Sequence, residues 1–244
     1  MRKLASLLTF VAVAFGGADS HATIVLDFEK ISPVYPFASN QIEALDYYGG
    51  GTSSAATSGP DYGVQISGNG LVICLNTLAV VCQLSNASRG GSGAGSDHGA
   101  LFFLSGSQTF INVAKGFDTG FALNYVSVAV TGEVRVYDGV NGSGALLGSI
   151  SLVPNASACP SYKAPYCGFS PVGVPFAGVA RSVVFAGVAN QIVFDDITFG
   201  AVTPGVAAPV PEPATAALML AGIGALGSMC RARRRRRLPS ARRH

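Results

Sequence analysis

Four cysteines in the middle of the chain form two pairs with the same spacing, and this spacing limits their chemistry. Each pair, Cys74 with Cys82 and Cys159 with Cys167, encloses seven residues. Structural zinc sites use shorter cysteine spacings and often histidine, and no histidine lies close to either pair. An even number of cysteines in an exported chain favours disulfides, with three pairings open. We expect the two local pairings, each stabilising the fold by about 2–3 kcal/mol.

Residues that could carry catalysis are few. His98 follows Asp97 in a glycine-rich stretch, and the other two histidines, His21 and His244, lie near the chain ends. No nucleophile elbow in a strand–turn–helix context accompanies this histidine. Glycoside hydrolysis needs two carboxyl groups about 5–9.5 Å apart across one cleft, and nothing in the sequence brings two glutamates together. We therefore expect no catalytic residue and a protein that is not an enzyme.

Residues 1–22 have the composition of a secretory signal peptide. Arg2 and Lys3 precede an apolar run over residues 4–15, and Ser20-His21-Ala22 places small residues at the positions that a signal peptidase recognises. The run is short for a membrane anchor, which is the alternative. We expect an N-terminal signal helix that is cleaved after Ala22.

The C-terminus has three consecutive parts. Pro211-Glu212-Pro213 comes first, an apolar run over residues 214–230 follows, and an arginine cluster occupies residues 231–237 before a tail over 238–244. An apolar run of 17 residues is near the lower limit for a transmembrane helix. The arginines would keep the far end of this helix in the cytoplasm, so the body would lie outside the membrane.

These three parts, in this order, resemble the PEP-CTERM sorting signal of Gram-negative bacteria. The same motif is also catalogued as an ice-binding protein C-terminal domain, a label that by itself implies no ice binding. The resemblance implies processing by an exosortase-type enzyme near Pro211, Glu212 and Pro213. It also implies a transient stay in the cell membrane, followed by release to the cell surface or into an extracellular exopolysaccharide or biofilm matrix.

The charge of the body differs from that of the whole chain. The 244 residues carry a formal net charge of +3, but residues 23–230 hold six basic and 12 acidic residues, a net charge of −6. Because phosphate binding needs basic residues gathered on the folded surface, this body is not expected to bind nucleic acid. A charged fraction of 12% with 31 glycines and 13 prolines is typical of an all-β domain with many turns.

Alternating and β-branched runs recur along the body, whereas helical periodicity is hard to find. Asp138-Gly139 and Asn141-Gly142 predict a hairpin between Tyr137 and Leu146. We expect an all-β, antiparallel two-sheet sandwich of the jelly-roll type over residues 23–201, with a barrel as the alternative and a linker over 202–209. The expected strands are residues 24–29, 64–67, 71–75, 100–104, 109–113, 124–130, 132–137, 146–152, 181–186 and 191–199.

The body is also similar to carbohydrate-binding-module-like jelly rolls, in which the first and last strands are often neighbours. The matching segments are Asp27-Phe28-Glu29 near the start of the body and Asp195-Asp196-Ile197 near its end. The resemblance implies a structural Ca²⁺ held by Glu29 and Asp195, with Asp27 and Asp196 as further ligands. Side chains of consecutive strand residues point to opposite faces, so Asp195 and Asp196 could both contribute only at a bulge.

Three functions fit these patterns. The first is a structural or interaction component of an extracellular matrix, with exopolysaccharide as its partner. The second is a carbohydrate-binding module, for which Tyr47, Tyr48 and Tyr62 beside the glycine-rich loop 49–63 are the candidate aromatic residues. The third is a hydrolase that uses His98. Apart from the Ca²⁺ implied by resemblance, no cofactor is expected.

Overall fold

Alternating apolar residues separated by glycine-rich turns produce strands along the whole body. The computed structural model describes residues 21–33, 42–75, 99–157 and 168–205. All of them belong to the first of the two units into which the chain divides, Met1–Ala207 and Ala208–His244. The expected signal helix and C-terminal helix lie outside the described residues. None of the helices within the described part is long and apolar enough to cross a membrane.

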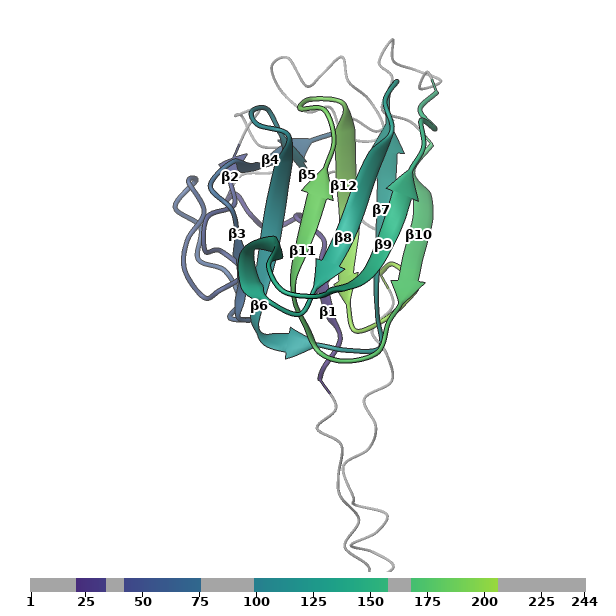
Figure 1. Cartoon of the computed structure of the whole chain (residues 1–244). Coiled ribbons are helices and arrows are strands. Elements are labelled where there is room, and N and C mark those ends of the chain that lie inside the picture. Colours follow the sequence, from purple (N-terminus) through teal and green to yellow (C-terminus); the bar gives the residue numbers. More distant parts are fainter. Residues whose placement is uncertain (1–20, 34–41, 76–98, 158–167, 206–244) are drawn as a thin grey trace, which may run out of the picture. The chain divides into compact units, whose positions relative to one another are not determined.

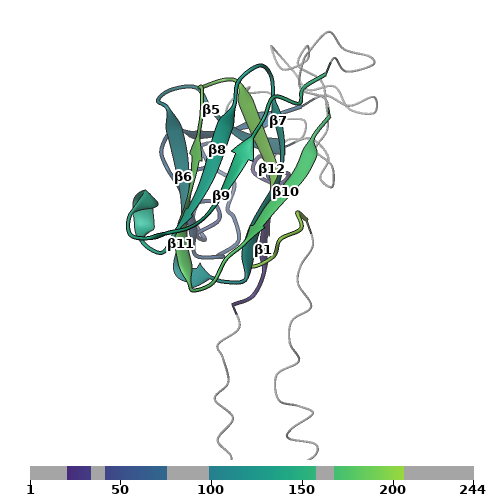
Figure 2. The same ribbon diagram turned by 45° about the vertical axis from the view of Figure 1, so that its right-hand side comes forward.

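The strands form two antiparallel sheets that lie as two layers (Figure 1, Figure 2). The larger sheet has the order β10-β7-β12-β5-β4-β2, with β1 also paired to β12. Its strands are β1 (Ile24–Leu26), β2 (Ile42–Glu43), β4 (Gly70–Cys74), β5 (Gly99–Phe103), β7 (Gly120–Ser127), β10 (Ser170–Pro175) and β12 (Ile192–Phe199). The predicted all-β, antiparallel two-sheet sandwich is confirmed.

The smaller sheet has the order β3-β6-β11-β8-β9. The predicted turn between β8 and β9 is confirmed as a hairpin containing a short 3-10 helix, η2 (Val140–Gly142), in which Asn141 and Gly142 have φ angles of 56° and 68°. Asn141 also exchanges two hydrogen bonds with Asn112 of β6, which hold this turn against the sheet. The strands are β3 (Val64–Ile66), β6 (Gln108–Phe117), β8 (Gly132–Tyr137), β9 (Leu146–Leu152) and β11 (Ala180–Ala186).

The core between the sheets is built around phenylalanine rings from both layers. Neighbouring rings in this cluster have centroids 4.8–6.4 Å apart and meet edge-on or tilted, the arrangements that aromatic quadrupoles favour. All of the rings are fully buried. The cluster consists of Phe117, Phe121, Phe185, Phe194 and Phe199.

Two strands were not expected from the sequence. The β2 pairing covers only two residues, which is too short to give a pattern. Strand β10 contains Pro171 and Pro175, and prolines argue against a central strand because they cannot donate to the ladder. Within the described part of the chain, β10 lies at the edge of the larger sheet and pairs with β7 alone, where proline is tolerated.

The expectation that the first strand runs to Glu29 was wrong. Strand β1 ends at Leu26, and Phe28 has a left-handed backbone with a φ of 58°. Its ring is nevertheless fully buried. The chain therefore turns sharply after β1 while keeping the alternate apolar side chain in the core.

The phenylalanine cluster predicts a large loss of stability on truncation. We expect Phe185→Ala to lower the free energy of unfolding by about 3–5 kcal/mol, because a buried ring that contacts Phe121 and Phe194 is replaced by a cavity. Urea denaturation measures this change. Val188→Ala is the control, since Val188 is 53% exposed, and a loss of similar size in both variants would contradict this account of the core.

Candidate functional site

The pairing of β1 with β12 brings the two acidic segments of the sequence together. The register places Leu26 opposite Ile197, so the residues that follow β1 lie beside Asp195 and Asp196. The negative charges of Asp27 and Glu29 both act on the carboxyl group of Asp196. The expectation that the first and last strands are neighbours is confirmed.

Strand β12 carries a bulge at the two consecutive aspartates. The pairing of β12 with β7 shifts register between Asp195 and Thr198, and Asp196 has a φ of 48°. Both aspartates are buried, with exposed fractions of 0% and 3%. An ordinary strand would send one of these side chains to each face.

Each of the two buried aspartates has specific polar partners. Asp195 Oδ1 accepts the Asp196 N–H at 2.7 Å, and Asn124 Nδ2 donates to Asp196 Oδ2 at 2.7 Å. Burial raises the pKa of Asp196 above its usual value, and the nearby charges of Asp27 and Glu29 add to this, whereas the Asn124 hydrogen bond lowers it.

The four carboxyl groups do not gather about one point. Among the described residues, no three His, Cys, Asp or Glu side chains are grouped closely enough to hold a metal ion. Glu29 Oε1 accepts the Gly99 N–H at 2.9 Å, and Asp27 is exposed whereas Asp195 is fully buried. Ca²⁺ binding by Glu29, Asp195, Asp27 and Asp196 therefore stays a prediction.

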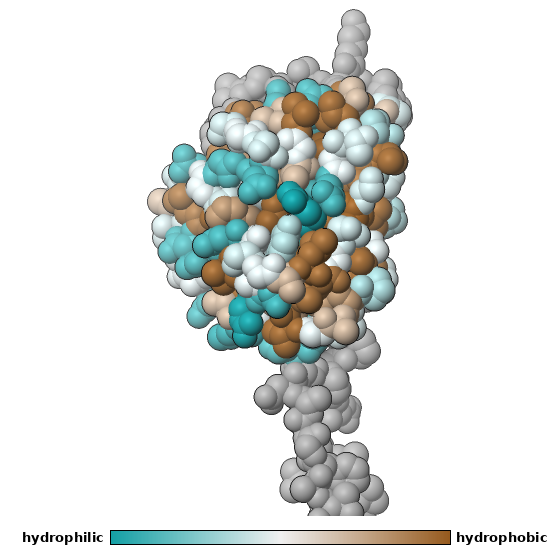
Figure 3. All heavy atoms as spheres, in the orientation of Figure 1, coloured by the Kyte–Doolittle hydropathy of each residue, from teal (hydrophilic) through white to brown (hydrophobic). Residues whose placement is uncertain are grey.

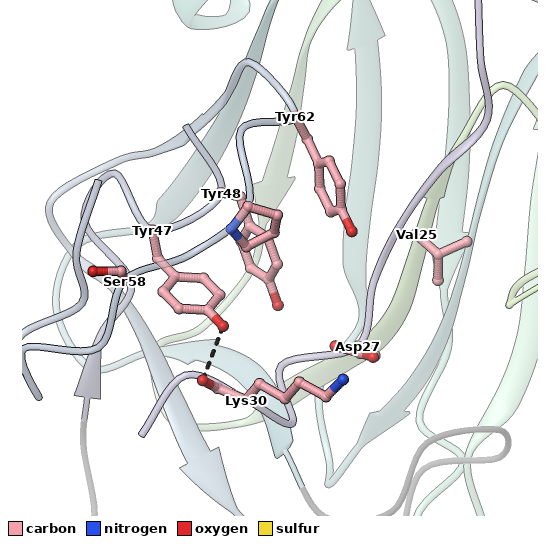
Figure 4. A pocket seen from close by; sticks show the side chains of 8 residues that line it. Val25, Asp27, Lys30, Tyr47, Tyr48, Ser58 and Tyr62 are labelled. Atoms are coloured by element: carbon pink, nitrogen blue, oxygen red, sulfur yellow. Dashed lines mark hydrogen bonds between the residues drawn. The ribbon is translucent and has the colours of Figure 1, made fainter. Parts of the chain in front are cut away.

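A pocket of about 340 Å³ opens beside β1 and the turn that follows it (Figure 4). All three candidate tyrosines line it, and Asp27 and Lys30 come from the turn after β1. In Figure 4 the three tyrosine hydroxyl groups point toward the side on which Asp27 and Lys30 lie, and the Lys30 side chain extends toward Asp27. The lining residues are Val25, Asp27, Lys30, Tyr47, Tyr48, Ser58, Pro60 and Tyr62.

Tyr48 is the central ring of the pocket wall. Its ring meets those of Tyr47 and Phe28 edge-on at centroid distances of 4.9 and 5.7 Å, and it stacks on Tyr62 at 6.1 Å with an interplanar angle of 13°. Tyr47 and Tyr48 are each only 4% exposed, whereas Tyr62 is 42% exposed. The wall is therefore two buried rings that support one accessible ring.

Two hydrogen bonds fasten this wall to the turn after β1. The Phe28 N–H donates to the Tyr48 hydroxyl oxygen at 2.9 Å, and the Tyr47 hydroxyl donates to the Lys30 carbonyl at 2.9 Å. Burial raises the pKa of Tyr48 well above 10.0, with the charge of Asp27 adding to this and the Phe28 hydrogen bond lowering it. The pKa of Tyr47 is raised by the same two causes, burial and then Asp27.

The glycine-rich loop 49–63 has a defined conformation that holds the tyrosines. Backbone hydrogen bonds join Gly50 N–H to Pro60 O at 3.1 Å and Gly59 N–H to Gly51 O at 3.0 Å. Glycine is required at position 59, because a Cβ there would lie 2.0 Å from the Tyr47 carbonyl oxygen. Asp27 and Lys30 were not expected in this pocket, since the contacts of the turn after β1 with Tyr47 and Tyr48 join segments that are distant in the sequence.

The structure describes only some of the other predicted site residues. Cys74, at the end of β4, is fully buried. Cys82, Cys159 and Cys167 lie outside the described residues, as do Asp97, His98 and the sorting residues Pro211, Glu212 and Pro213. The local disulfide pairings therefore stay a prediction. Ala22, the expected cleavage position, is exposed at the start of the described part.

The comparisons with known proteins identify the C-terminal motif. The PEP-CTERM protein-sorting motif is found at residues 209–237, which confirms the resemblance seen in the sequence. This motif marks the chain as an exported protein that carries a membrane-anchored sorting signal for an exosortase-type system. No curated protein matches the chain.

Two solved structures are weakly similar to the chain. The K2 cleaved adhesin domain of Lys-gingipain has a TM-score of 0.41 at 12% identity, with 74% of this chain and 100% of that chain covered. CsCBM6-3 from Clostridium stercorarium, solved with cellobiose, has a TM-score of 0.29 at 18% identity, with 42% of this chain and 73% of that chain covered.

The buried hydroxyl of Tyr48 predicts a specific alkaline sensitivity. The folded-state pKa of Tyr48 lies above the unfolded value of about 10, so the folded state holds this proton more tightly. The resulting stability is fully present below about pH 10 and is lost as the pH rises through the folded-state pKa. Urea midpoints measured from about pH 9 to about pH 11 should fall more steeply for the wild type than for Tyr48→Phe. Tyr137→Phe, outside the pocket, should keep the wild-type slope, and equal slopes in all three proteins would contradict the assignment.

The sequence-based Ca²⁺ hypothesis predicts that metal removal destabilises the body. A ligand that binds only the folded state, at about 100 times its Kd, stabilises it by about 2.7 kcal/mol. EDTA should then lower the thermal midpoint, and Asp195→Asn should remove the difference between Ca²⁺ and EDTA. Glu43→Gln is the matched control, because Glu43 is an exposed acid on β2. A wild-type midpoint that is unchanged by EDTA rules the Ca²⁺ site out.

Proposed function

We propose that this protein is a non-catalytic, polysaccharide-binding component of an extracellular matrix, and that it binds through the tyrosine pocket. The single observation that carries the proposal is the pocket itself, in which one accessible ring, Tyr62, lies beside the carboxylate of Asp27 and the ammonium group of Lys30. An aromatic ring offers an apolar surface to the face of a sugar ring. Charged side chains at its edge form strong hydrogen bonds with sugar hydroxyl groups.

The composition of the pocket supports binding over hydrolysis. Hydrolysis of a glycosidic bond ordinarily uses two carboxyl groups that flank the bond. Among the residues that line the pocket, Asp27 is the one carboxylate, and Glu29 is engaged by the Gly99 N–H. A sugar held here would meet an acceptor and a donor but no acid–base pair.

Export gives this pocket a physiological setting. In the proposed sequence of events the signal peptide is removed after Ala22, and helix 214–230 holds the chain in the membrane while the arginines at 231–237 remain inside. The exosortase-type enzyme then processes the chain near Pro211, Glu212 and Pro213, and the body reaches the cell surface or the exopolysaccharide matrix.

The face seen in Figure 3 mixes polar and apolar residues, as expected of an exposed surface.

Retention on polysaccharide tests the proposal. The exported form is collected, its mass is checked for a start at Thr23, and its retardation is measured on columns of the matrix exopolysaccharide and of neutral glucans. We expect retention by the wild type and about tenfold weaker binding by Tyr62→Ala, equivalent to about 1.4 kcal/mol.

The matched control for this experiment is Tyr137→Ala, a half-buried tyrosine on β8 outside the pocket. It should bind as the wild type does. If the wild type is retained on none of the polysaccharides, or if both tyrosine variants lose binding equally, the pocket is not a polysaccharide site.

A further inference from the structure

Only one of the three aromatic rings in the pocket can stack on a ligand. Tyr62 is 42% exposed, and the parallel ring of Tyr48 supports it from within the wall. Tyr47 and Tyr48 are 4% exposed, and their hydroxyl groups are hydrogen-bonded to the turn after β1. A single phenol ring is similar in area to one pyranose ring, so the aromatic surface suits one sugar unit.

The volume of the pocket also indicates that it takes one sugar unit. Its volume of about 340 Å³ lies near the lower limit of small-molecule sites, which range from about 300 to about 1,000 Å³. A groove that follows a polysaccharide chain would need several aligned rings. This pocket has one accessible ring with the Asp27–Lys30 turn at its side.

The two charged groups of the pocket have opposite signs, so the pocket has no net charge that would favour a charged sugar over a neutral one. Asp27 only accepts hydrogen bonds and Lys30 only donates them, whereas each sugar hydroxyl does both. The ion pairs within the described residues join His21 to Asp118 and Glu133 to Arg135, so neither pocket residue is part of one. A uronic acid carboxylate would be repelled by Asp27 and attracted by Lys30, and the reverse holds for the ammonium group of an amino sugar, so a charge on the sugar gains little from this pair. The net charge of −6 over residues 23–230 further disfavours polyanions.

We infer that the tyrosine pocket takes one neutral pyranose unit, at a chain end or a branch of the polysaccharide. The apolar face of the sugar ring lies on Tyr62, and two of its hydroxyl groups bridge the carboxylate of Asp27 and the ammonium group of Lys30. This inference rests on the proposed polysaccharide-binding function and adds the size and charge of the unit that is recognised.

Competition with monosaccharides tests the inference on the exported protein. Retention on neutral glucan is challenged with methyl glucoside, methyl galactoside and methyl mannoside, and in parallel with glucuronate and glucosamine. We expect at least one neutral glycoside to elute the protein at a concentration at least tenfold lower than either charged sugar. A longer oligosaccharide of the same unit should compete no more than about threefold better per molecule.

Single-residue variants identify the side chains that bind the sugar. Tyr62→Phe should keep the wild-type affinity because the ring remains, whereas Asp27→Asn and Lys30→Gln should each weaken binding of the neutral glycoside about tenfold. Lys115→Gln is the matched control for Lys30, since Lys115 is an exposed lysine on β6. Thermal midpoints within a few degrees of the wild type show that a loss of affinity is not a loss of folding.

The outcomes separate this inference from the proposed function. If the protein binds polysaccharide but glucuronate or glucosamine competes best, or if affinity rises steeply with oligosaccharide length, the inference is wrong and the proposed function stands. Unchanged affinity in both Asp27→Asn and Lys30→Gln also overturns the inference alone. Absence of any polysaccharide binding overturns both.

Discussion

Strand β12 is the constraint on which the rest of the structure depends. It pairs with β7 along one side, and with β5 and β1 along successive parts of the other side. All eight of its residues are buried, and two of its rings, Phe194 and Phe199, belong to the aromatic core. The last strand therefore completes both the larger sheet and the packing between the layers. The first strand has its place only because β12 is there to pair with it.

The bulge in β12 links this pairing to the candidate site. A left-handed backbone costs free energy at any residue other than glycine, and so does the burial of a carboxylate. Asp196 has both features. Asn124 of β7 and the Asp196 N–H supply hydrogen bonds that offset the burial of the two aspartates. Phe28, in the turn beside them, is left-handed as well. Two strained residues thus lie at the junction that shapes the turn from Asp27 to Lys30.

The pocket is held by contacts between this turn and a loop rather than by the sheets themselves. The two buried tyrosines connect the parts, because their rings pack into the core cluster while their hydroxyl groups bind the backbone of Phe28 and Lys30. Such a wall is already ordered before a ligand arrives, which lowers the entropy lost on binding. The basic, apolar segment over residues 209–237 carries the sorting motif, and the acidic body carries the pocket.

The sequence by itself determined the features that depend only on residues close together in the chain. The sorting motif at residues 209–237 is linear, most strands follow from alternation, and the hairpin follows from Asp-Gly and Asn-Gly. Tyr47, Tyr48 and Tyr62 could be named as candidates because they lie in or directly before a glycine-rich loop. The tertiary structure alone decided that β10 is an edge strand that tolerates its prolines, that Asp195 and Asp196 are buried at a bulge, and that Asp27 and Lys30 share a pocket with the tyrosines. These features depend on contacts between distant parts of the chain, such as the pairing of β1 with β12, whose residues are about 170 positions apart, and no local pattern encodes a contact at that separation.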